Sequence, residues 1–434
     1  MDRETDKHRD MGMGPGMGGR GGLSLRNLKT FSSLKNPIYR LYFSGMLGQR
    51  ASMNMQMIAR SMLVYRLTDS AAILGLVSLA QALPMLFLAL FGGAIADRVQ
   101  KKYVLLAGLV SSAVISLGIA LALTMGYLSA DRTGSWWILV VASLLQGSIM
   151  GLMIPSRQSI IPEIVSEGQL MNAISLDSLG MNTLRLMAPA LSGFLIDAFD
   201  FASVYYVMTG MYLVGTVFIA FMPLTSTMAL RGGGALADIR GGIKYVRHET
   251  TILLLLAFTL CAVVLSMPYI MLMPIFAEDI IKVGASGMGM LISVSGIGAM
   301  IGSLVLASLP DKKRGVMLLA SSLLLGLALA SFSFFSSPST WMLSLGLMVF
   351  VGLGQSGRMT LGNTLIQYYV DDEYRGRVMS MYMMEFGMTS FGTFTAGLIA
   401  EAVGAKWALG GFATALILIS ILSLIFIPRL RRLD

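Results

Sequence analysis

The segment GLVSLAQALPMLFLALFGGAIADRVQKK, residues 75–102, joins a long apolar run to a short loop that is rich in basic residues. About 20 helical residues cross the roughly 30 Å hydrocarbon core of a bilayer, so the run is long enough to span it. The same arrangement recurs about a dozen times between residues 40 and 427, and only 13% of all residues are charged, against about 25% in soluble domains. The sequence therefore predicts an α-helical membrane protein.

Twelve apolar segments are predicted to cross the membrane. We expect helices and not barrel strands, because a backbone in lipid must satisfy its own hydrogen bonds and these segments are too long and too uniformly apolar for strands. The predicted spans are residues 40–65, 70–96, 103–128, 135–160, 172–197, 202–223, 251–276, 287–309, 315–335, 341–369, 377–401 and 407–427.

Lysine and arginine are distributed unequally between the two sides of these spans. The side that holds both termini carries about six times as many as the other side, where the basic residues are Arg66, Arg132, Lys282 and Lys406. By the positive-inside rule, both termini are predicted to lie in the cytoplasm of a bacterium, with the chain in its cytoplasmic membrane. The net charge of +9 then reflects topology, which argues against a nucleic-acid partner.

The spans divide the chain into two halves of six. The predicted parts are a disordered, glycine-rich cytoplasmic tail at 1–34, an N-terminal half at 35–223, a cytoplasmic central loop at 224–250 and a C-terminal half at 251–434. No cleavable signal peptide precedes the first span, and no cofactor or metal is expected. Cys261 is the only cysteine, so no disulfide is expected either.

Two internal echoes support this division. Residues 75–97 and 289–311 begin with glycine, end with aspartate and are followed by basic residues, with an offset of 214 between them. Residues 193–197 and 397–401 repeat a glycine and an acid at an offset of 204. Duplicated halves often build a central transport site at their interface, so that rocking one half against the other exposes the site to alternate sides.

The loop sequence GGAIADRVQKK resembles the loop motif of the major facilitator superfamily. The matching residues are Gly93, Asp97, Arg98, Lys101 and Lys102. More narrowly, VYRLT at 64–68, GLVSLAQALP at 75–84, IPEIV at 161–165 and RGRVMSMYM at 375–383 resemble the transmembrane secretion effectors, the branch that includes enterobactin and macrolide exporters. The resemblance covers the chain after residue 35 and implies twelve helices in two pseudo-symmetric six-helix halves.

The resemblance also implies roles for particular residues. The five loop residues would clamp the cytoplasmic ends of the helices in the outward-facing state, although they also fit a role in fixing topology alone. Pro189 and Gly193 resemble the antiporter motif of exporters and would form a hinge; ordinary close packing is the alternative. The fourth-span motif is incomplete, because Ser143 stands where the motif has an arginine ahead of Gln146.

Few ionisable residues lie within the spans, and none lies in the third, sixth, ninth or twelfth, which in the superfamily face lipid. Charges are costly at this depth unless they face water or a partner. The first span also places polar residues on two adjacent stripes at about 100° per residue, which suits the wall of an aqueous cavity. The predicted cavity residues are Gln49, Arg50, Asn54, Gln56, Arg60, Arg185 and Arg358.

Four arginines in the spans outnumber two carboxylates, Asp177 and Glu385, which favours an anionic or zwitterionic substrate. Alternatively, Arg185 and Arg358 pair with these carboxylates between helices, and Arg50 and Arg60 extend to the membrane surfaces.

The 35 methionines fit either a cavity for varied apolar ligands or ordinary core filling. Glu385 and Asp177 are the candidate proton carriers, since both histidines lie outside the spans.

These features predict a secondary active transporter, monomeric in the bilayer, that exports an amphipathic or anionic small molecule of siderophore or drug type in exchange for protons. A lipid or lysolipid flippase on the same fold is the alternative. A nucleotide-binding loop of the G-x-x-x-x-G-K-[ST] type, a metal-binding cluster and a catalytic cluster are all missing from the sequence, so we expect neither an ATPase nor another enzyme.

The predicted topology can be tested by cysteine labelling. Single cysteines at Thr68, Thr133 and Ser337, in a Cys261→Ala background, should react with an impermeant maleimide added outside whole cells, because all three lie in predicted external loops. Protection of two of the three positions would rule out the twelve-span arrangement.

Overall fold

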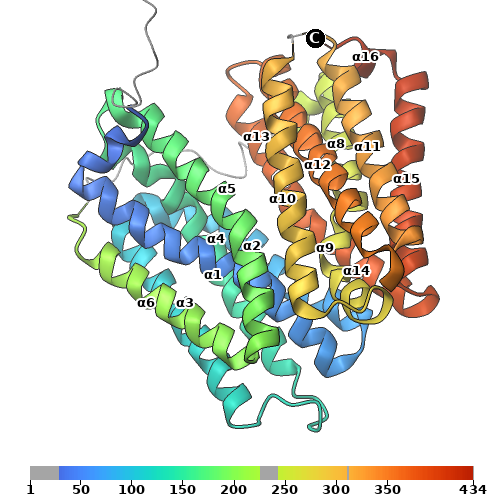
Figure 1. The fold of residues 1–434 in the computed structure, drawn as a ribbon. Helices are drawn as coiled ribbons and strands as arrows, with labels where there is room; N and C mark the ends of the chain where they lie inside the picture. The colour runs from blue at the N-terminus through green and yellow to red at the C-terminus, as the bar shows by residue number, and fades with distance from the viewer. Residues whose placement is uncertain (1–28, 225–242, 310–311, 434) are drawn as a thin grey trace, which may run out of the picture.

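The computed structural model describes residues 29–224, 243–309 and 312–433, without the side chains of residues 29–30, 89–98, Gln158 and Phe386. Throughout these ranges the secondary structure is helical, with no strand (Figure 1). Most of the predicted tail and central loop lie outside the described residues. The predicted tail ends too late, because residues 29–35 form the 3₁₀ helix η2 (Lys29–Lys35), in which the Ser33 hydroxyl donates to Asn172 on the fifth span (2.7 Å).

Each predicted span of the N-terminal half is one helix. These are α1 (Pro37–Thr68), α2 (Ala71–Arg98), α3 (Lys101–Thr124), α4 (Trp137–Ile164), α5 (Glu167–Ala198) and α6 (Phe201–Ala220). Local signals set their ends. The Asn36 side chain accepts hydrogen bonds from the backbone N–H groups of Ile38 and Tyr39, with Pro37 in the first turn, and Asp69 in the left-handed conformation ends α1.

The C-terminal half repeats this plan with two broken crossings. Pro268 interrupts the seventh, and a break at Met384 interrupts the eleventh. The elements are α8 (Thr250–Ser266), α9 (Pro268–Ile275), the π-helical turn η3 (Phe276–Ile280), α10 (Gly284–Ser308), α11 (Arg314–Phe335), η4 (Pro338–Thr340), α12 (Trp341–Tyr369), α13 (Arg375–Met383), α14 (Glu385–Val403), α15 (Ala405–Phe426) and α16 (Pro428–Arg431).

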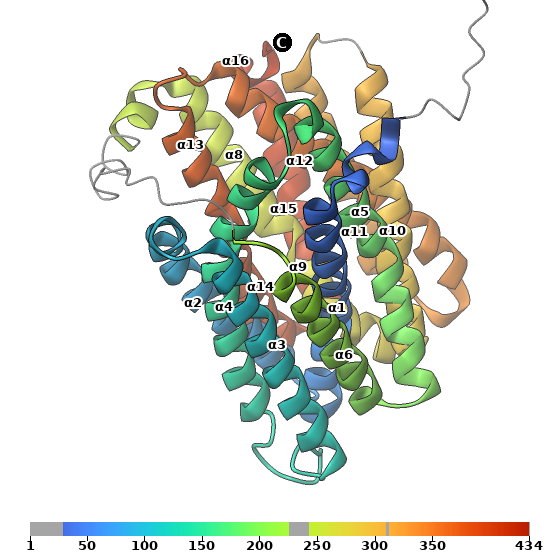
Figure 2. The same ribbon diagram turned by 90° about the vertical axis from the view of Figure 1, so that its left-hand side faces the viewer.

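Ten helical segments of the described chain are long and apolar enough to span a membrane. The other two crossings are α1, which carries many polar side chains, and the interrupted pair α13 and α14. Helix α1 packs against α5 and α6 of its own half, and α14 packs against α15 and α8 of its own half and α2 of the other, whereas α13 contacts mainly α12 and α14 (Figures 1 and 2). The predicted all-helical membrane fold with two six-helix halves is therefore confirmed.

The two halves meet at one end of the molecule and diverge toward the other. We name the end that holds residues 29 and 433 the terminal face, and the end that holds the α1–α2, α5–α6 and α14–α15 turns the opposite face (Figure 1). The contact between the halves consists mainly of α2 against α14 and α5 against α10. Hydrogen bonds between described residues of the two halves gather toward the opposite face.

The glycines of the first sequence echo both lie in this contact. A Cβ atom on Gly75 would come within 2.8 Å of the Phe394 Cα atom on α14. A Cβ atom on Gly289 would come within 2.5 Å of the Pro189 carbonyl oxygen on α5. Small residues allow two helix backbones to approach this closely in a membrane, so the repeat marks the two halves of one pseudo-symmetric interface.

The glycines of the second sequence echo lie on the two helices that face those of the first. Gly193 on α5 faces α10, and Gly397 on α14 faces α2. A side chain on Gly193 would clash with the Ala285 carbonyl oxygen on α10, and a Cβ atom on Gly397 would lie 2.5 Å from the Ala71 carbonyl oxygen on α2. Ala71 and Ala285 are themselves 214 residues apart, the offset of the first echo. Each half therefore presents the same pair of surfaces to the other.

Two carboxylates complete this symmetry at the opposite face. The Asp197 carboxylate accepts from the backbone N–H of Ser286 in the first turn of α10 (2.7 Å), and the Glu401 carboxylate accepts from that of Ala72 in the first turn of α2 (3.2 Å). The first N–H groups of a helix have no partner within the helix and attract negative charge. Each half thus caps a helix of the other.

A further ion pair joins the halves beside these caps. The Arg66 guanidinium on α1 lies 2.7 Å from the Glu278 carboxylate on η3 and 3.6 Å from the Asp197 carboxylate. The neighbouring Tyr65 hydroxyl donates to Asp279. We name the glycine contacts, the two carboxylate caps and these side-chain bonds the interhalf seal.

Replacing Gly193 tests the seal. The Gly193→Val side chain cannot fit against the backbone of α10, so it should open the seal and expose the Ser78 position, which lies between the halves and contacts Ser390. A Ser78→Cys reporter in a Cys261→Ala background should then react severalfold faster with an impermeant maleimide applied at the opposite face. Gly118→Val is the matched control, because no atom lies within 4 Å of a Cβ at that position on α3. Equal labelling rates in both variants would contradict the role given to Gly193.

Candidate functional site

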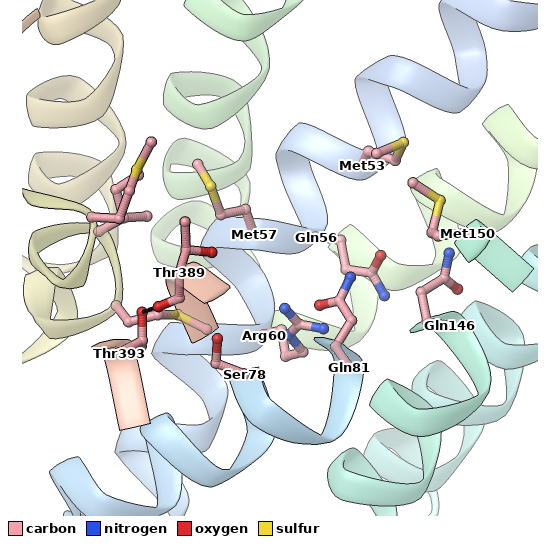
Figure 3. A pocket seen from close by; sticks show the side chains of 13 residues that line it. Met53, Gln56, Met57, Arg60, Ser78, Gln81, Gln146, Met150, Thr389 and Thr393 are labelled. Carbon is pink, nitrogen blue, oxygen red and sulfur yellow. Dashed lines mark hydrogen bonds between the residues drawn. The ribbon is translucent and has the colours of Figure 1, made fainter. Parts of the chain in front are cut away.

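A cavity of about 270 Å³ lies between the two halves, on the terminal-face side of the seal (Figure 3). Helices α1, α2 and α4 of the first half and the α8–α9 junction and α14 of the second half contribute its walls. The lining residues are Met53, Gln56, Met57, Arg60, Ser78, Gln81, Gln146, Met150, Met267, Ile270, Met271, Thr389 and Thr393.

One positive charge and three amides form the wall on the N-terminal half. Figure 3 shows Arg60, Gln56, Gln81 and Gln146 directed into the same space. Arg60 is only 8% exposed, its Nη1 atom donates to the Ser143 hydroxyl at 3.4 Å, and its Nε atom has no partner. Neither an aspartate nor a glutamate is among the residues that line the cavity. The wall is therefore positive and rich in hydrogen-bond donors.

Methionines form much of the remaining wall. Met53 and Met57 are one helical turn apart on α1, as are Met267 and Met271 at the start of α9, and Met150 lies beside Gln146 on α4. These unbranched, polarisable side chains can adapt to apolar ligands of varied shape. The cavity thus combines a charged polar side with an adaptable apolar side.

Only two of the seven predicted cavity residues, Gln56 and Arg60, line this cavity. Gln49 lies nearer the terminal face, where its amide oxygen accepts from Arg157 on α4 (3.5 Å). Asn54 donates to the backbone carbonyl of Arg50 in the preceding turn (2.9 Å). The predicted polar stripe on the first span is therefore divided between the cavity and contacts within the N-terminal half.

Arg50 and Asp177, which the sequence analysis treated separately, form an ion pair. The Arg50 Nη2 atom lies 2.6 Å from the Asp177 carboxylate, and its Nη1 atom donates to the Asp177 carbonyl oxygen at 3.0 Å. This pair joins α1 to α5 within one half. Arg50 is buried and is not free to extend to the membrane surface or to bind a ligand in this conformation.

The two remaining arginines and the second carboxylate lie outside the cavity wall. Arg185 is exposed on α5, whereas Arg358 is buried on α12 with an unpartnered Nε atom. Glu385 is buried at the start of α14 and accepts a hydrogen bond from the Thr259 hydroxyl on α8. The structure shows no salt bridge between the described residues Arg358 and Glu385.

Sequence reasoning missed several polar residues of the cavity. Ser78 and Gln81 are three residues apart on α2, and Thr389 and Thr393 are four residues apart on α14, so each pair lies on one helix face. This spacing was visible in the sequence. However, uncharged polar residues are common in membrane helices, so a pair on one helix face does not by itself indicate a cavity.

Comparison with protein families identifies the chain. Residues 28–434 match the family model described as transmembrane secretion effector. The chain belongs to the transmembrane secretion effector family. This family falls within the major facilitator superfamily, which confirms the resemblance found in the sequence, and its named relatives are transporters, which confirms that the chain is not an enzyme.

Two curated relatives are similar to this chain over most of its length. The staphyloferrin A transporter of Staphylococcus aureus is 23% identical over 336 residues, 77% of this chain and 82% of that protein. The multidrug efflux pump Tap of Mycolicibacterium fortuitum is 24% identical over 416 residues, 92% of this chain and 98% of that protein.

Solved structures share the fold at lower identity. A variant of the nucleoside transporter NupG superposes with a TM-score of 0.72 and 13% identity, covering 88% of this chain and 98% of that one. A bacterial homologue of the human lysosomal transporter Spinster, solved in an inward-facing and unoccupied conformation, superposes with a TM-score of 0.69 and 13% identity, covering 94% of this chain and 98% of that one. These similarities show the fold alone.

The loop-motif residues of this secretion effector lie near the terminal face. Gly93, Asp97 and Arg98 fall at the end of α2, in the segment whose side chains are not described. Lys101 forms an ion pair with Glu163 at the end of α4. Lys102 donates to the backbone carbonyl at residue 220, at the end of α6 (2.7 Å). Both lysines thus tie the start of α3 to neighbouring helices of the same half.

The predicted hinge residues lie in the interface between the halves. Pro189 and Gly193 are buried on α5, and each is in close backbone contact with α10. A bend of α5 at these residues would change the contact with the other half directly. The hinge itself remains a prediction.

The Arg50–Asp177 pair predicts a stability effect. Arg50→Gln leaves Asp177 without its counter-ion, which should lower stability by about 1–3 kcal/mol and lower the Tm of the purified protein. Asp177→Asn should act similarly, and the double variant should lose less than the sum of the two, because the coupling is lost only once. Arg132→Gln in the exposed α3–α4 loop is the control for loss of one positive charge. Strictly additive losses would show that the pair contributes nothing.

Proposed function

We propose that this transporter exports an amphipathic small molecule by alternating access between its two halves, driven by a proton gradient. The observation that carries the proposal is a ligand-sized cavity between pseudo-symmetric halves that are sealed on one side only. An arrangement of this kind lets one rocking motion transfer the cavity from one side of the membrane to the other.

The direction of opening supports loading from the cytoplasm. Under the positive-inside prediction the terminal face is cytoplasmic, so the seal lies on the outer side and the halves diverge inward (Figure 1). This is the state in which an exporter would take up substrate.

The named relatives support the substrate type. One transports a siderophore and another is a multidrug efflux pump, and both types of substrate fit a cavity with a polar side and a methionine-rich side. A flippase would need room for acyl chains. The lining of this cavity, with one arginine and three amides beside the methionines, favours a compact amphipathic substrate over a lipid that is fully enclosed.

Proton coupling is proposed to use Glu385. Asp177 lies in an ion pair with Arg50 that joins two helices of the N-terminal half, so its carboxylate already has a structural partner. Glu385 is buried, has no cation in ion-pair contact among the described residues, and contacts a hydroxyl group on α8. It also stands where α13 ends and α14 begins, so its protonation can act on a break in the helix.

Transport into inside-out vesicles tests the proposal. Vesicles from cells that express the protein, energised with an acidic interior, should accumulate at least one probe from a macrolide, a carboxylate siderophore and a lysophospholipid, and a protonophore should abolish accumulation. No accumulation of any probe above vesicles without the protein would contradict export. Uptake of the lysophospholipid alone would favour the flippase.

Glu385→Gln tests the coupling step. The amide keeps the shape and the Thr259 contact but cannot titrate, so accumulation should fall to the background level while binding of the probe is retained. Thr395→Ala on the exposed side of the same helix is the control. If Glu385→Gln accumulates the probe with the pH dependence of the parent, coupling must lie at Asp177, at Glu163 or in another ion.

A further inference from the structure

We infer that Arg60, with the amides of Gln56, Gln81 and Gln146, forms a subsite for an anionic group, and that the substrate is a compact organic anion with an apolar body. This inference rests on the proposed function, because it names the substrate class of the same cavity. The sequence predicts a preference for anions from four arginines. Of these four, only Arg60 lines the cavity.

Arg60 differs from Arg50, on the same helix, in what surrounds it. Arg50 faces a carboxylate at 2.6 Å, whereas Arg60 has a serine hydroxyl at 3.4 Å and an unpartnered Nε atom. A guanidinium stays charged at physiological pH and carries five N–H donors. A buried charge without a counter-ion is costly to the folded protein, so an anion that enters the cavity relieves an existing cost.

The surrounding groups suit an anion and not a cation. The amides of Gln56 and Gln81 lie beside the guanidinium and that of Gln146 lies farther along the same wall (Figure 3), and each can direct N–H donors toward a bound oxygen. A carboxylate or sulfonate can accept two parallel hydrogen bonds from a guanidinium, an arrangement stronger than contacts between neutral groups. With no acid among the lining residues, a cationic drug would meet repulsion without compensation.

The apolar body has its own place in the cavity. Met57, Met267, Ile270 and Met271 line the cavity with thioether and aliphatic groups, which favour a desolvated, polarisable surface such as an aromatic ring. A volume of about 270 Å³ has room for a body such as a fused ring or a short chain. Charge recognition therefore belongs to the N-terminal half, whereas both halves contribute apolar contacts.

A ligand that contacts both halves of the protein affects how the halves close during transport. An anion held by Arg60 on α1 and an apolar body held by α9 would bridge the two halves, and closing them around the ligand would bury both parts. A neutral ligand of the same shape would make the apolar contacts but would leave the guanidinium uncompensated. The subsite thus distinguishes ligands by charge and tolerates differences in apolar shape.

A matched ligand pair tests the inference. Purified full-length protein in detergent is titrated with 2-naphthylacetate and with 2-naphthylacetamide, and the shift in Tm reports binding to the native state. The anion should bind the parent about tenfold more tightly than the amide. Arg60→Gln should remove this preference, Arg60→Lys should retain part of it, and Arg132→Gln, which removes an exposed arginine of the α3–α4 loop, should leave it unchanged.

The Tm of the ligand-free proteins separates a binding role of Arg60 from a structural role, because the two roles predict opposite changes in Tm. If Arg60 serves as an unpaired binding group, Arg60→Gln removes a buried charge and its Tm should equal or exceed that of the parent. A lower Tm, or an anion preference that survives in Arg60→Gln, would overturn the inference. Because uptake of any probe into vesicles tests export separately, transport without an Arg60-dependent preference would refute the subsite alone.

A lipid headgroup is a second source of the same anionic chemistry. Titration with dihexanoyl phosphatidylglycerol and with dihexanoyl phosphatidylcholine separates the two sources. Stabilisation by the naphthylacetate and not by the phosphatidylglycerol supports a free organic anion. Arg60-dependent stabilisation by the phosphatidylglycerol alone would contradict the compact substrate proposed here.

Discussion

Close backbone contact between the two halves is the constraint on which the rest of the structure depends. In lipid, helices gain little from burying apolar side chains against one another, so association relies on close packing and hydrogen bonds. Gly75, Gly193, Gly289 and Gly397 provide the packing, and the carboxylate caps near them provide hydrogen bonds between the halves. These groups come from duplicated segments, so they form two matching contacts between the halves. Both contacts lie near one face of the molecule.

The cavity follows from where this contact ends. Beyond the seal, α1 and α9 both border the cavity, and one methionine pair from α1 and another from the α8–α9 junction line it. The Thr389–Thr393 face of α14 and the Ser78–Gln81 face of α2 continue from the sealed region into the cavity wall. Helices that hold the halves together therefore also contact the ligand, so occupancy of the cavity and the state of the seal are physically connected.

Charged residues of the same type serve different purposes because their neighbours differ. Arg50 and Arg60 lie on one helix, about three turns apart, and both are buried. Arg50 is neutralised by Asp177 and joins two helices of one half, whereas Arg60 faces amides and an open space. Glu385 is a third case, a carboxylate beside a hydroxyl at a helix break. Partner groups, and not burial alone, distinguish structural charges from those available to a ligand or a proton.

The sequence by itself determined the helical class, the twelve crossings, the two halves and the family, because length, apolar content and repeated motifs are properties of consecutive residues. It also placed Arg60 on a polar face of the first span. Only the tertiary structure decided that Arg50 pairs with Asp177, that Gln49 lies outside the cavity, and that Gln81 and Thr393 lie within it. Helical periodicity predicts which residues of one helix share a face, but the partner of each face belongs to another helix, and that choice is made when the halves pack.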